Sequence, residues 1–320
     1  MDSHNNSPED KIAIILSTYN GEKYIAEQLN AIQGQTHTNW CCYIRDDGSK
    51  DSSPAILEKY IAHDKRFTLA GDIKGNMGLN ASHYYLISLT TENYIAMCDQ
   101  DDVWNSDKLE LTLKKLKEIE TTTKIPALVH TDSIVVDSQL NVINDYFIGK
   151  RGKVSGLNGI LFANSAQGGS IMINGSLRQI AINIPPKLPY DYHLAIIAEL
   201  TGARAFIPQT LLKYRQHSTS SIATSNSNQS TTTKKTGVTP SLLISLGNYK
   251  HIANDFSKLA VPKHIEANLA DFFYLFEGKS RLKKLFIYFK NRYPFYRRKD
   301  LICFIYLLIK NENLKLIGST

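Results

Sequence analysis

Three carboxylates follow a short apolar run in the first half of the chain, at Asp99, Asp101 and Asp102. Like charges this close repel one another, so the cluster is costly unless something positive lies among them. A hard divalent cation such as Mg²⁺ or Mn²⁺ meets that need, because it prefers oxygen ligands. Alternate side chains of an extended segment point the same way, which would let Asp99 and Asp101 share one ion while Asp102 faces elsewhere. A solvated acidic turn at a strand end is the competing interpretation.

Apolar β-type runs alternate with helical patterns around this cluster. We expect strands at 11–16, 40–45, 67–70 and 94–98, and helices at 22–33, 53–63, 79–89 and 107–120. This alternation predicts βαβ units and a parallel sheet. Ligands of such sheets bind at the carboxyl ends of the strands, so the polar clusters at 17–20, 46–49 and 99–102 should meet at one edge. There is no G-x-G-x-x-G after the first strand and no P-loop motif, which argues against a classical dinucleotide fold.

Beyond Pro126 the alternation loosens. The pattern predicts a strand at 127–136, a glycine-led strand and turn at 167–175, a helix at 194–200 and further segments at 205–208 and 211–217. The polar stretch 218–239 is typical of a mobile linker. The expected organisation is therefore a disordered N-terminus at 1–10, an α/β domain at 11–220, a linker at 221–240 and a helical, basic, amphipathic extension at 241–320.

Composition restricts the class of protein. The 320 residues are 42% hydrophobic and 21% charged, with a net charge of +7, which suits a globular protein with a sizeable core. Four cysteines without a C-x-x-C motif suggest reduced thiols and a cytoplasmic protein. The polar, acidic N-terminus does not resemble a signal peptide, and no apolar run reaches the roughly 18–20 residues that span a bilayer. We expect a soluble or peripheral protein.

Several segments resemble, in order, the signatures of family 2 glycosyltransferases. They are Ser17-Thr-Tyr-Asn20, Asp46-Asp-Gly-Ser-Lys-Asp51, Asn76-Met-Gly78 and Asp99-Gln-Asp-Asp-Val-Trp104. Asp191 and the segment 214–217 extend the resemblance, which covers about residues 11–220, and the nearest subgroup is the bacterial rhamnosyltransferase-like enzymes. The resemblance implies a GT-A fold: a Rossmann-like, mixed but mostly parallel sheet with helices on both faces, here followed by the helical extension.

The resemblance also implies a nucleotide and donor site. Its expected members are Ser17, Thr18, Tyr19, Asn20, Asp46, Asp47, Asn76, Gly78, Asp99, Gln100, Asp102, Trp104 and Arg215. Tyr19 would lie against the base, Asp46 would accept a hydrogen bond from base or ribose, and Asp47 would support its turn. Ordinary Asp-Gly and Asn-Gly turns are the alternative for these segments, and a core position is the alternative for Trp104.

A divalent ion, Mg²⁺ or Mn²⁺, is the cofactor that the resemblance implies. Asp99, Asp101 and His217 are its expected ligands, and it would stabilise the charge of the departing diphosphate. A structural role is the alternative for His217.

Asp191 is the candidate catalytic base, since a carboxylate can take the proton of the attacking hydroxyl. A helix N-cap is the alternative. Gly168, Gly169 and Tyr192 are expected at the acceptor, and a tight turn is the alternative for the two glycines. The Asp191-Tyr-His sequence departs from the paired Trp of the subgroup. The reaction implied is an inverting transfer from a dTDP- or UDP-sugar, with dTDP-rhamnose as one candidate, to a growing lipid-linked surface polysaccharide.

The segment 280–299 mixes basic and aromatic residues. Such segments lie on anionic membrane surfaces, which suits peripheral attachment to the inner face of the plasma membrane. No nucleic acid is expected, because no RNA-binding module is visible. A basic packing helix is the alternative. Two rival functions remain open: a sugar nucleotidyltransferase, and a non-catalytic sugar- or membrane-binding protein.

Overall fold

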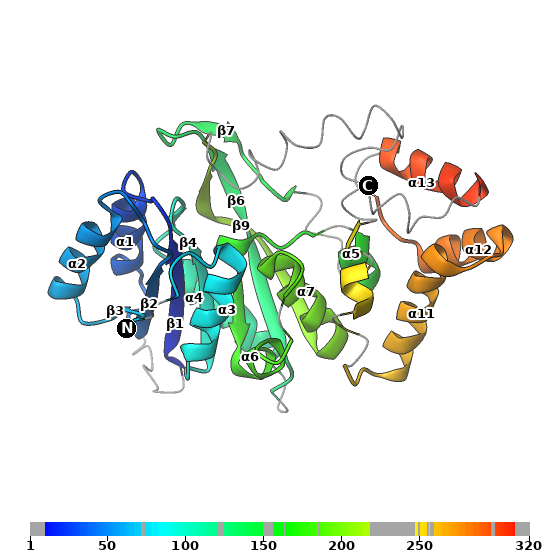
Figure 1. The fold of residues 1–320 in the computed structure, drawn as a ribbon, viewed down its shortest axis with the longest axis horizontal. Helices are drawn as coiled ribbons and strands as arrows, with labels where there is room; N and C mark the ends of the chain where they lie inside the picture. Colours follow the sequence, from blue (N-terminus) through cyan, green and yellow to red (C-terminus); the bar gives the residue numbers. More distant parts are fainter. Residues whose placement is uncertain are drawn as a thin grey trace.

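The computed structural model describes residues 10–71, 74–120, 124–149, 156–162, 164–184, 186–217, 247–248, 250–254, 256, 259–295 and 298–310. Within these ranges one mixed sheet runs through the α/β part of the molecule, with strand order β3-β2-β1-β4-β8-β6-β9-β5, and β7 pairs with β6 (Figure 1). The predicted linker lies outside the described residues, as does the predicted disordered N-terminus apart from Asp10.

The N-terminal half of the sheet is parallel, as the alternation predicts. Its strands are β1 (Ile12–Thr18), β2 (Trp40–Asp46), β3 (Phe67–Leu69) and β4 (Tyr94–Asp99), and the connecting helices are α1 (Ile25–Gln33), α2 (Ser53–His63) and α3 (Leu79–Leu89). The bounds of α2 and α3 are those expected. Helix α1 begins three residues later than expected, because residues 22–24 form a turn before it. Helix α4 (Lys108–Ile119) follows the short strand β5 (Val103–Trp104).

The other half of the sheet mixes directions. Strand β8 (Met172–Asn174) lies antiparallel between β4 and β6 (Ala127–Val136), and β6 runs parallel to the long strand β9 (Ala203–Arg215). The sequence predicts two segments where β9 is one strand. Its pairing with β6 shifts between Ile207 and Thr210, and this irregularity accommodates Pro208, which has no N–H to donate. The short elements β7 (Val142–Asn144), α5 (Leu157–Phe162) and α6 (Gly175–Ala181) were not expected.

Helices cover both faces of the sheet (Figure 1). On one face, alternate residues of β1 (Ile12, Ile14, Leu16) pack in a buried cluster with α1, α2 and α4. On the other face, Ala13 and Ile15 pack with α3, α5, α6 and α7 (Tyr190–Thr201). The run is apolar throughout because a central parallel strand buries both of its faces.

Three further helices follow: α11 (Lys263–Glu277), α12 (Arg281–Asn291) and α13 (Arg298–Lys310). Their inner faces belong to the same buried cluster as α5 and α7, and Phe162 contacts Phe272, Tyr293 and Phe304 at ring-centroid distances of 5.4, 5.0 and 5.2 Å. In its described residues the extension is therefore helical, as expected, and one face of these helices packs on the core. Among the described helices, none combines the length and the apolar character that crossing a bilayer requires.

Candidate functional site

The three polar clusters meet at the carboxyl edge of the parallel strands, as predicted. Strand pairing aligns Thr18 with Asp46 on one side of β1 and Ser17 with Asp99 on the other. In the far half of the sheet, the end of β6 aligns with Arg215. Five strands thus bring their terminal residues to one edge, which is where ligands bind in open α/β sheets.

Gln100 connects the first cluster to the acidic one. Its Oε1 accepts hydrogen bonds from Thr18 Oγ1 at 2.6 Å and from the Tyr19 amide at 2.9 Å, and its Nε2 donates to the Tyr19 carbonyl. A Cβ on Gly21 would lie 2.3 Å from Gln100 Oε1, so the glycine keeps this contact possible. The Tyr19 ring is 46% exposed and therefore accessible to a planar ligand. Thr18 is buried and supports this turn rather than lining a surface.

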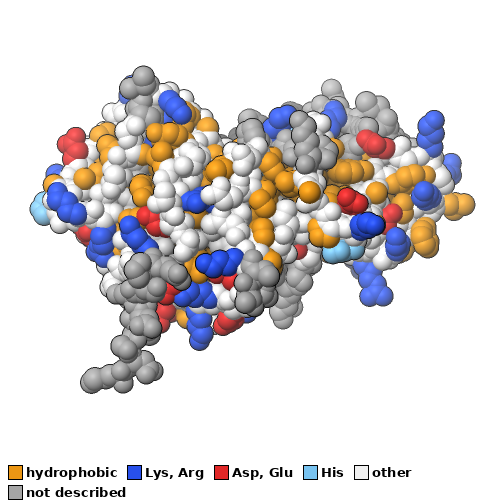
Figure 2. All heavy atoms as spheres, turned by 90° about the horizontal axis from the view of Figure 1, so that it is seen from below, with side chains coloured by type: hydrophobic (Ala, Val, Ile, Leu, Met, Phe, Trp, Pro, Cys, Tyr) orange, Lys and Arg blue, Asp and Glu red, His pale blue; other side chains and the backbone are white. Residues whose placement is uncertain are grey.

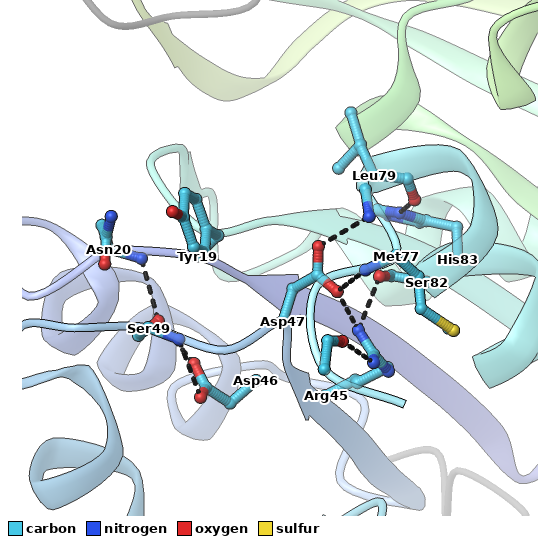
Figure 3. Close-up of polar contacts among 12 residues, drawn as sticks. Tyr19, Asn20, Arg45, Asp46, Asp47, Ser49, Met77, Leu79, Ser82 and His83 are labelled. Atoms are coloured by element: carbon cyan, nitrogen blue, oxygen red, sulfur yellow. Dashed lines mark hydrogen bonds and ion pairs between the residues drawn. The ribbon is translucent and has the colours of Figure 1, made fainter. Parts of the chain in front are cut away.

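The turn after β2 is held by its own side chains (Figure 3). Asp46 accepts hydrogen bonds from the Ser49 amide and hydroxyl, and Ser49 Oγ in turn accepts from the Asn20 amide at 2.9 Å. Asn20 has a positive φ of 49° and its Oδ1 accepts from the Lys50 amide. Asp46 is partly exposed, so it could still meet a ligand.

Asp47 supports the neighbouring 75–78 turn, whereas the sequence predicted that it supports its own turn at 46–49 (Figure 3). Its carboxylate accepts from the amides of Met77 at 2.7 Å and Gly78 at 2.8 Å, and it forms a buried ion pair with Arg45. The Arg45 guanidinium also donates to Ser82 Oγ and to the Gly75 carbonyl. Asp47 is thus a structural anchor, whereas Asn76 in that turn is exposed.

Asp99 and Asp102 face the same backbone. Oδ2 of Asp99 accepts from the Gly169 amide at 2.9 Å, and a Cβ on Gly169 would lie 2.7 Å from Asp102 Oδ2 and 3.0 Å from Asp99 Oδ2. The expectation that Asp102 faces away from Asp99 is therefore wrong. The strand ends at Asp99 and residues 100–101 form a turn, so the alternation of an extended segment does not apply.

Burial makes these carboxylates reluctant to ionise. Burial, and then the charge of Asp101, raises the pKa of Asp99 to about 7, while hydrogen bonds from Tyr190 and Gly169 lower it. Burial, followed by the charges of Asp101 and Asp99, raises the pKa of Asp102 well above its usual range. Oδ2 of Asp102 is buried without a hydrogen-bond partner. A buried carboxylate oxygen without a hydrogen-bond donor is best explained by a site for a cation, which would be its partner.

Asp101 and His217 come together from distant parts of the chain. His217 Nε2 lies 2.8 Å from Asp101 Oδ2, and both side chains are partly exposed. Two of the three predicted metal ligands are thus in contact, whereas the oxygens of Asp99 are engaged by Gly169 and Tyr190. Across the described ranges, no three His, Cys, Asp or Glu side chains converge in a ready-made metal cage.

The chemistry of the site nevertheless suits a divalent ion. Carboxylate oxygens and an imidazole nitrogen are ligands that Mg²⁺ and Mn²⁺ accept, and the partner for the orphan oxygen of Asp102 would be positive. An anionic diphosphate would be repelled by this acidic edge unless a cation lay between them.

Arg215 does not lie where a phosphate could reach it. The residue is 1% exposed, and its guanidinium donates to the carbonyls of Asp101 and Ser138 and pairs with Glu27. Its amide donates to Asp102 Oδ1 at 3.3 Å. The predicted phosphate contact is therefore replaced by a structural role: Arg215 holds the acidic turn in place.

Asp191 lies in the first turn of α7. The helix begins four residues earlier than expected, its N-cap is Pro189, and Asp191 Oδ1 accepts from the Tyr192 amide at 2.7 Å. Burial raises the pKa of Asp191 to about 6, and hydrogen bonds lower it. Its neighbour Tyr190 donates a hydrogen bond to Asp99, and the charge of Asp191 helps to raise the pKa of Asp99, so the two carboxylates belong to one acidic cluster.

The pKa of Tyr214 is raised by burial and by the same carboxylates. Burial, and then Asp102, Asp99, Asp101 and Asp191 in that order, raises the pKa of its phenol. Four carboxylates from two segments of the chain, 99–102 and Asp191, therefore act on one side chain.

Trp104 and Tyr192 lie in the core. Trp104 is buried under α1 and α4, which is the alternative that its sequence position left open. Tyr192 is buried against α5, and its hydroxyl donates to the Leu161 carbonyl, so its predicted contact with an acceptor is wrong. Gly168 and Gly169 are buried too, and a Cβ on Gly168 would meet the Tyr190 hydroxyl at 2.0 Å. The glycines leave room for Tyr190 and the carboxylates.

Two residues of the site were not anticipated. The Tyr190 hydroxyl donates to Asp99 Oδ1 at 3.1 Å, and its ring stacks on His83 with centroids 4.0 Å apart. Lys108 is fully buried, its ammonium lies 3.8 Å from the centroid of the Trp104 ring, and burial lowers its pKa to about 8. Lys108 could have been predicted as a site residue, because it begins a helix shortly after the acidic cluster. No local signal pointed to Tyr190.

Known proteins resemble this chain in both sequence and fold. Residues 13–163 match the family model described as Glycosyl transferase family 2. An uncharacterized glycosyltransferase of Haemophilus influenzae is 27% identical over 233 residues, which are 70% of this chain and 71% of that protein. An uncharacterized protein of Mycobacterium tuberculosis is 26% identical over 209 residues, 64% of this chain, and the chain spans only 59% of that relative's length.

Solved structures share the fold. S. aureus TarS 1-349, in complex with UDP-GlcNAc, aligns with a TM-score of 0.59 and 16% identity, covering 97% of this chain and 90% of that one. The mannosyltransferase PcManGT of Pyrobaculum calidifontis, in complex with GDP-Man and Mn²⁺, aligns with a TM-score of 0.52 and 14% identity, covering 98% of this chain and 88% of that one. The fold is thus that of GT-A glycosyltransferases, and the sequence match over residues 13–163 supports a family 2 glycosyltransferase.

Proposed function

We propose that this chain transfers a sugar, with inversion, from a nucleoside-diphosphate donor to an acceptor hydroxyl. The observation that carries the proposal is that the acidic segment 99–102 lies at the carboxyl edge of the sheet and is joined to the start of α7, which carries Asp191, by the hydrogen bond from Tyr190 to Asp99. Isolated acidic turns would not converge from separate segments. The family match and the solved relatives with UDP-GlcNAc and GDP-Man support a nucleotide-sugar donor.

Asp191 is the proposed base. It removes the proton of the acceptor hydroxyl as that oxygen bonds to the anomeric carbon, and the bond to the diphosphate oxygen breaks on the opposite face. A pKa of about 6 suits this role, because the carboxylate is ionised at neutral pH yet more basic than an ordinary Asp. The open face of Tyr19 would receive the base, and Asp46 would bind base or ribose.

A divalent ion completes the proposal. Asp101 and His217, with Asp99, would hold Mg²⁺ or Mn²⁺, which when bound supplies positive charge to the leaving diphosphate. The contact between Asp101 and His217 and the Mn²⁺ of the similar mannosyltransferase support this assignment. The finer identities that we propose are a dTDP- or UDP-sugar, with dTDP-rhamnose as one candidate, and a lipid-linked glycan acceptor at the inner face of the plasma membrane.

Thermal stabilisation tests the donor site first. UDP, dTDP and GDP are each added with and without Mn²⁺, and a ligand at 100 times its Kd stabilises the folded state by about 2.7 kcal/mol. We expect one diphosphate to raise the Tm in a Mn²⁺-dependent way, and Asp101→Ala to lose that shift. Absence of any shift in folded protein would overturn the proposal.

Product analysis separates the rivals. A sugar nucleotidyltransferase would release pyrophosphate as it forms a nucleotide sugar, whereas the proposed enzyme releases a nucleoside diphosphate. A non-catalytic sugar- or membrane-binding protein would show no metal-dependent donor turnover, so turnover that Asp191→Asn abolishes would count against it. The anomeric configuration of the product, read by NMR, tests inversion.

A further inference from the structure

Helices α12 and α13 each present a stripe of exposed apolar side chains with the same spacing. On α12 the stripe is Leu282, Phe286 and Phe289, exposed by 77%, 67% and 62%. On α13 it is Ile302, Tyr306 and Ile309, exposed by 59%, 55% and 48%. Positions i, i+4 and i+7 fall on one side of a helix, so each stripe is a continuous face. We call these six residues the outer stripes.

The outer stripes are exposed although both helices already bury another apolar face in the core. The opposite face of α12 buries Ile287 and Tyr288, and that of α13 buries Phe304, Leu307 and Leu308, all in the main core cluster. The helices are therefore already anchored. Contiguous apolar patches left on the surface of an otherwise packed protein mark interaction sites.

Positive charge accompanies the stripes. The two helices carry seven Lys and Arg residues against one acid, Asp300, which is buried. All of these cations except Lys284 are exposed: Arg281, Lys283, Lys290, Arg298, Lys299 and Lys310. The end of the molecule over α11 and α12 shows apolar side chains beside Lys and Arg in Figure 2. A partner that fits this surface is both apolar and negatively charged.

This combination favours a lipid surface over a second copy of the chain. A symmetric pair would bring the same basic patches face to face, and like charges across an interface are costly. Protein interfaces are also depleted in Lys. Helices with Phe and Leu on one face and Lys and Arg beside them instead lie in the plane of a membrane, with the apolar face sunk about 5–10 Å among the headgroups.

We propose that the outer stripes of α12 and α13 dock this protein on a bilayer of anionic phospholipid. The biological reason for docking rests on the proposed function, because a lipid-linked acceptor would lie at such a surface. The inference adds which face of the protein contacts the membrane. Phe286 and Phe289 are expected to enter the interface, while Arg298 and Lys299 meet phosphate headgroups.

Vesicle flotation of the full chain tests the proposal. We compare vesicles of phosphatidylcholine with vesicles containing phosphatidylglycerol, and expect binding that requires the anionic lipid and weakens with salt. The variant Phe286→Ser/Phe289→Ser/Ile302→Ser should bind at least tenfold more weakly. Arg298→Gln/Lys299→Gln should lose about fivefold per charge. The matched control is Ile182→Ser, an exposed apolar residue after α6 that should bind as the wild type does.

Three outcomes would overturn the inference: folded wild type that does not float, a stripe variant that floats equally well, or a wild-type dimer that the stripe variant converts to monomer without any vesicle binding. The nucleotide-induced Tm shift is measured on the same preparations. A stripe variant that loses flotation but keeps this shift supports docking alone. Flotation without any nucleotide response would leave docking intact and count against the proposed transferase.

Discussion

Tyr190 joins the start of α7 to the end of β4 through one hydrogen bond, from its hydroxyl to Asp99 Oδ1 at 3.1 Å. Its amide also donates to Asn80 Oδ1 at 3.0 Å, so α3 and α7 are tied at the same point. The next residue is Asp191. The proposed base is therefore positioned relative to the acidic cluster by its immediate neighbour, which is how precise placement of a catalytic group is achieved in a rigid site.

Gly169→Ala should disturb the acidic cluster without removing any of its groups. The added Cβ would lie 2.7 Å from Asp102 Oδ2 and 3.0 Å from Asp99 Oδ2, so these carboxylates must shift. We expect a loss of about 1–3 kcal/mol in the free energy of unfolding, the usual cost of overpacking, together with loss of the nucleotide-induced Tm shift. Urea unfolding and thermal scans measure the two effects.

The matched control is Gly175→Ala, at the start of α6. Its Cβ would lie 3.7 Å from the nearest atom, the Asn93 carbonyl oxygen, which is an ordinary contact. Stability should stay level or rise by less than about 1 kcal/mol. Equal behaviour of the two alanine variants would show that crowding at Gly169 is not the cause.

Periodicity predicted much of the fold, and physical reasons limit the rest. The bounds of α2 and α3 followed from helical patterns, and the meeting of 17–20, 46–49 and 99–102 followed from parallel strands ending at one edge. The orientation of Asp102 did not follow, because the turn at 100–101 interrupts the strand. The role of Arg215 depends on β9 pairing with β5 and β6, which sequence-local patterns do not encode.

Asp47 and Asp46 are adjacent but should respond differently to substitution. Asp47→Ala leaves the buried Arg45 without its ion-pair partner and two amides without acceptors, so we expect a loss of about 3 kcal/mol in unfolding free energy. Asp46→Ala removes only its contacts with Ser49 and should cost about 1 kcal/mol. If Asp46 binds base or ribose, its variant loses nucleotide affinity while remaining folded. Similar stability of the two variants would contradict this division of roles.

Arg215→Ala distinguishes a structural arginine from a phosphate ligand. The change removes donors to Asp101 and Ser138 and the pair with Glu27, so unfolding free energy without ligand should fall by about 2–4 kcal/mol. Arg215→Lys keeps the charge but loses the planar fork, and should recover only part of this loss. The contrary result is a variant of unchanged stability whose only defect is weak nucleotide binding, which would restore the phosphate-contact prediction.

Asp191→Asn should abolish transfer yet stabilise the protein. Burial raises the pKa of Asp191 from 3.8 to about 6, so the fold favours the neutral acid and is penalised when the group ionises. The penalty is absent below the unfolded pKa and complete above about pH 6. One pKa unit corresponds to 1.36 kcal/mol, and because Asp191 is partly exposed we expect a stabilisation of about 1–2 kcal/mol at pH 8 that disappears near pH 3.5.

The same carboxylate sets the acid limb of the activity. Transfer requires ionised Asp191, so the rate in the wild type should rise as the pH increases through about 6 and level off above it. The matched control is Asp137→Asn, because that carboxylate lies in the turn before β7 and accepts only local hydrogen bonds, from Gln139 and Asn141. Its variant should keep both the rate and its pH profile. If the Asp191→Asn protein still transfers sugar, another residue is the base. If it is inactive and more stable than the wild type at pH 8, the ionised Asp191 carboxylate is required for transfer and lowers the stability of the fold.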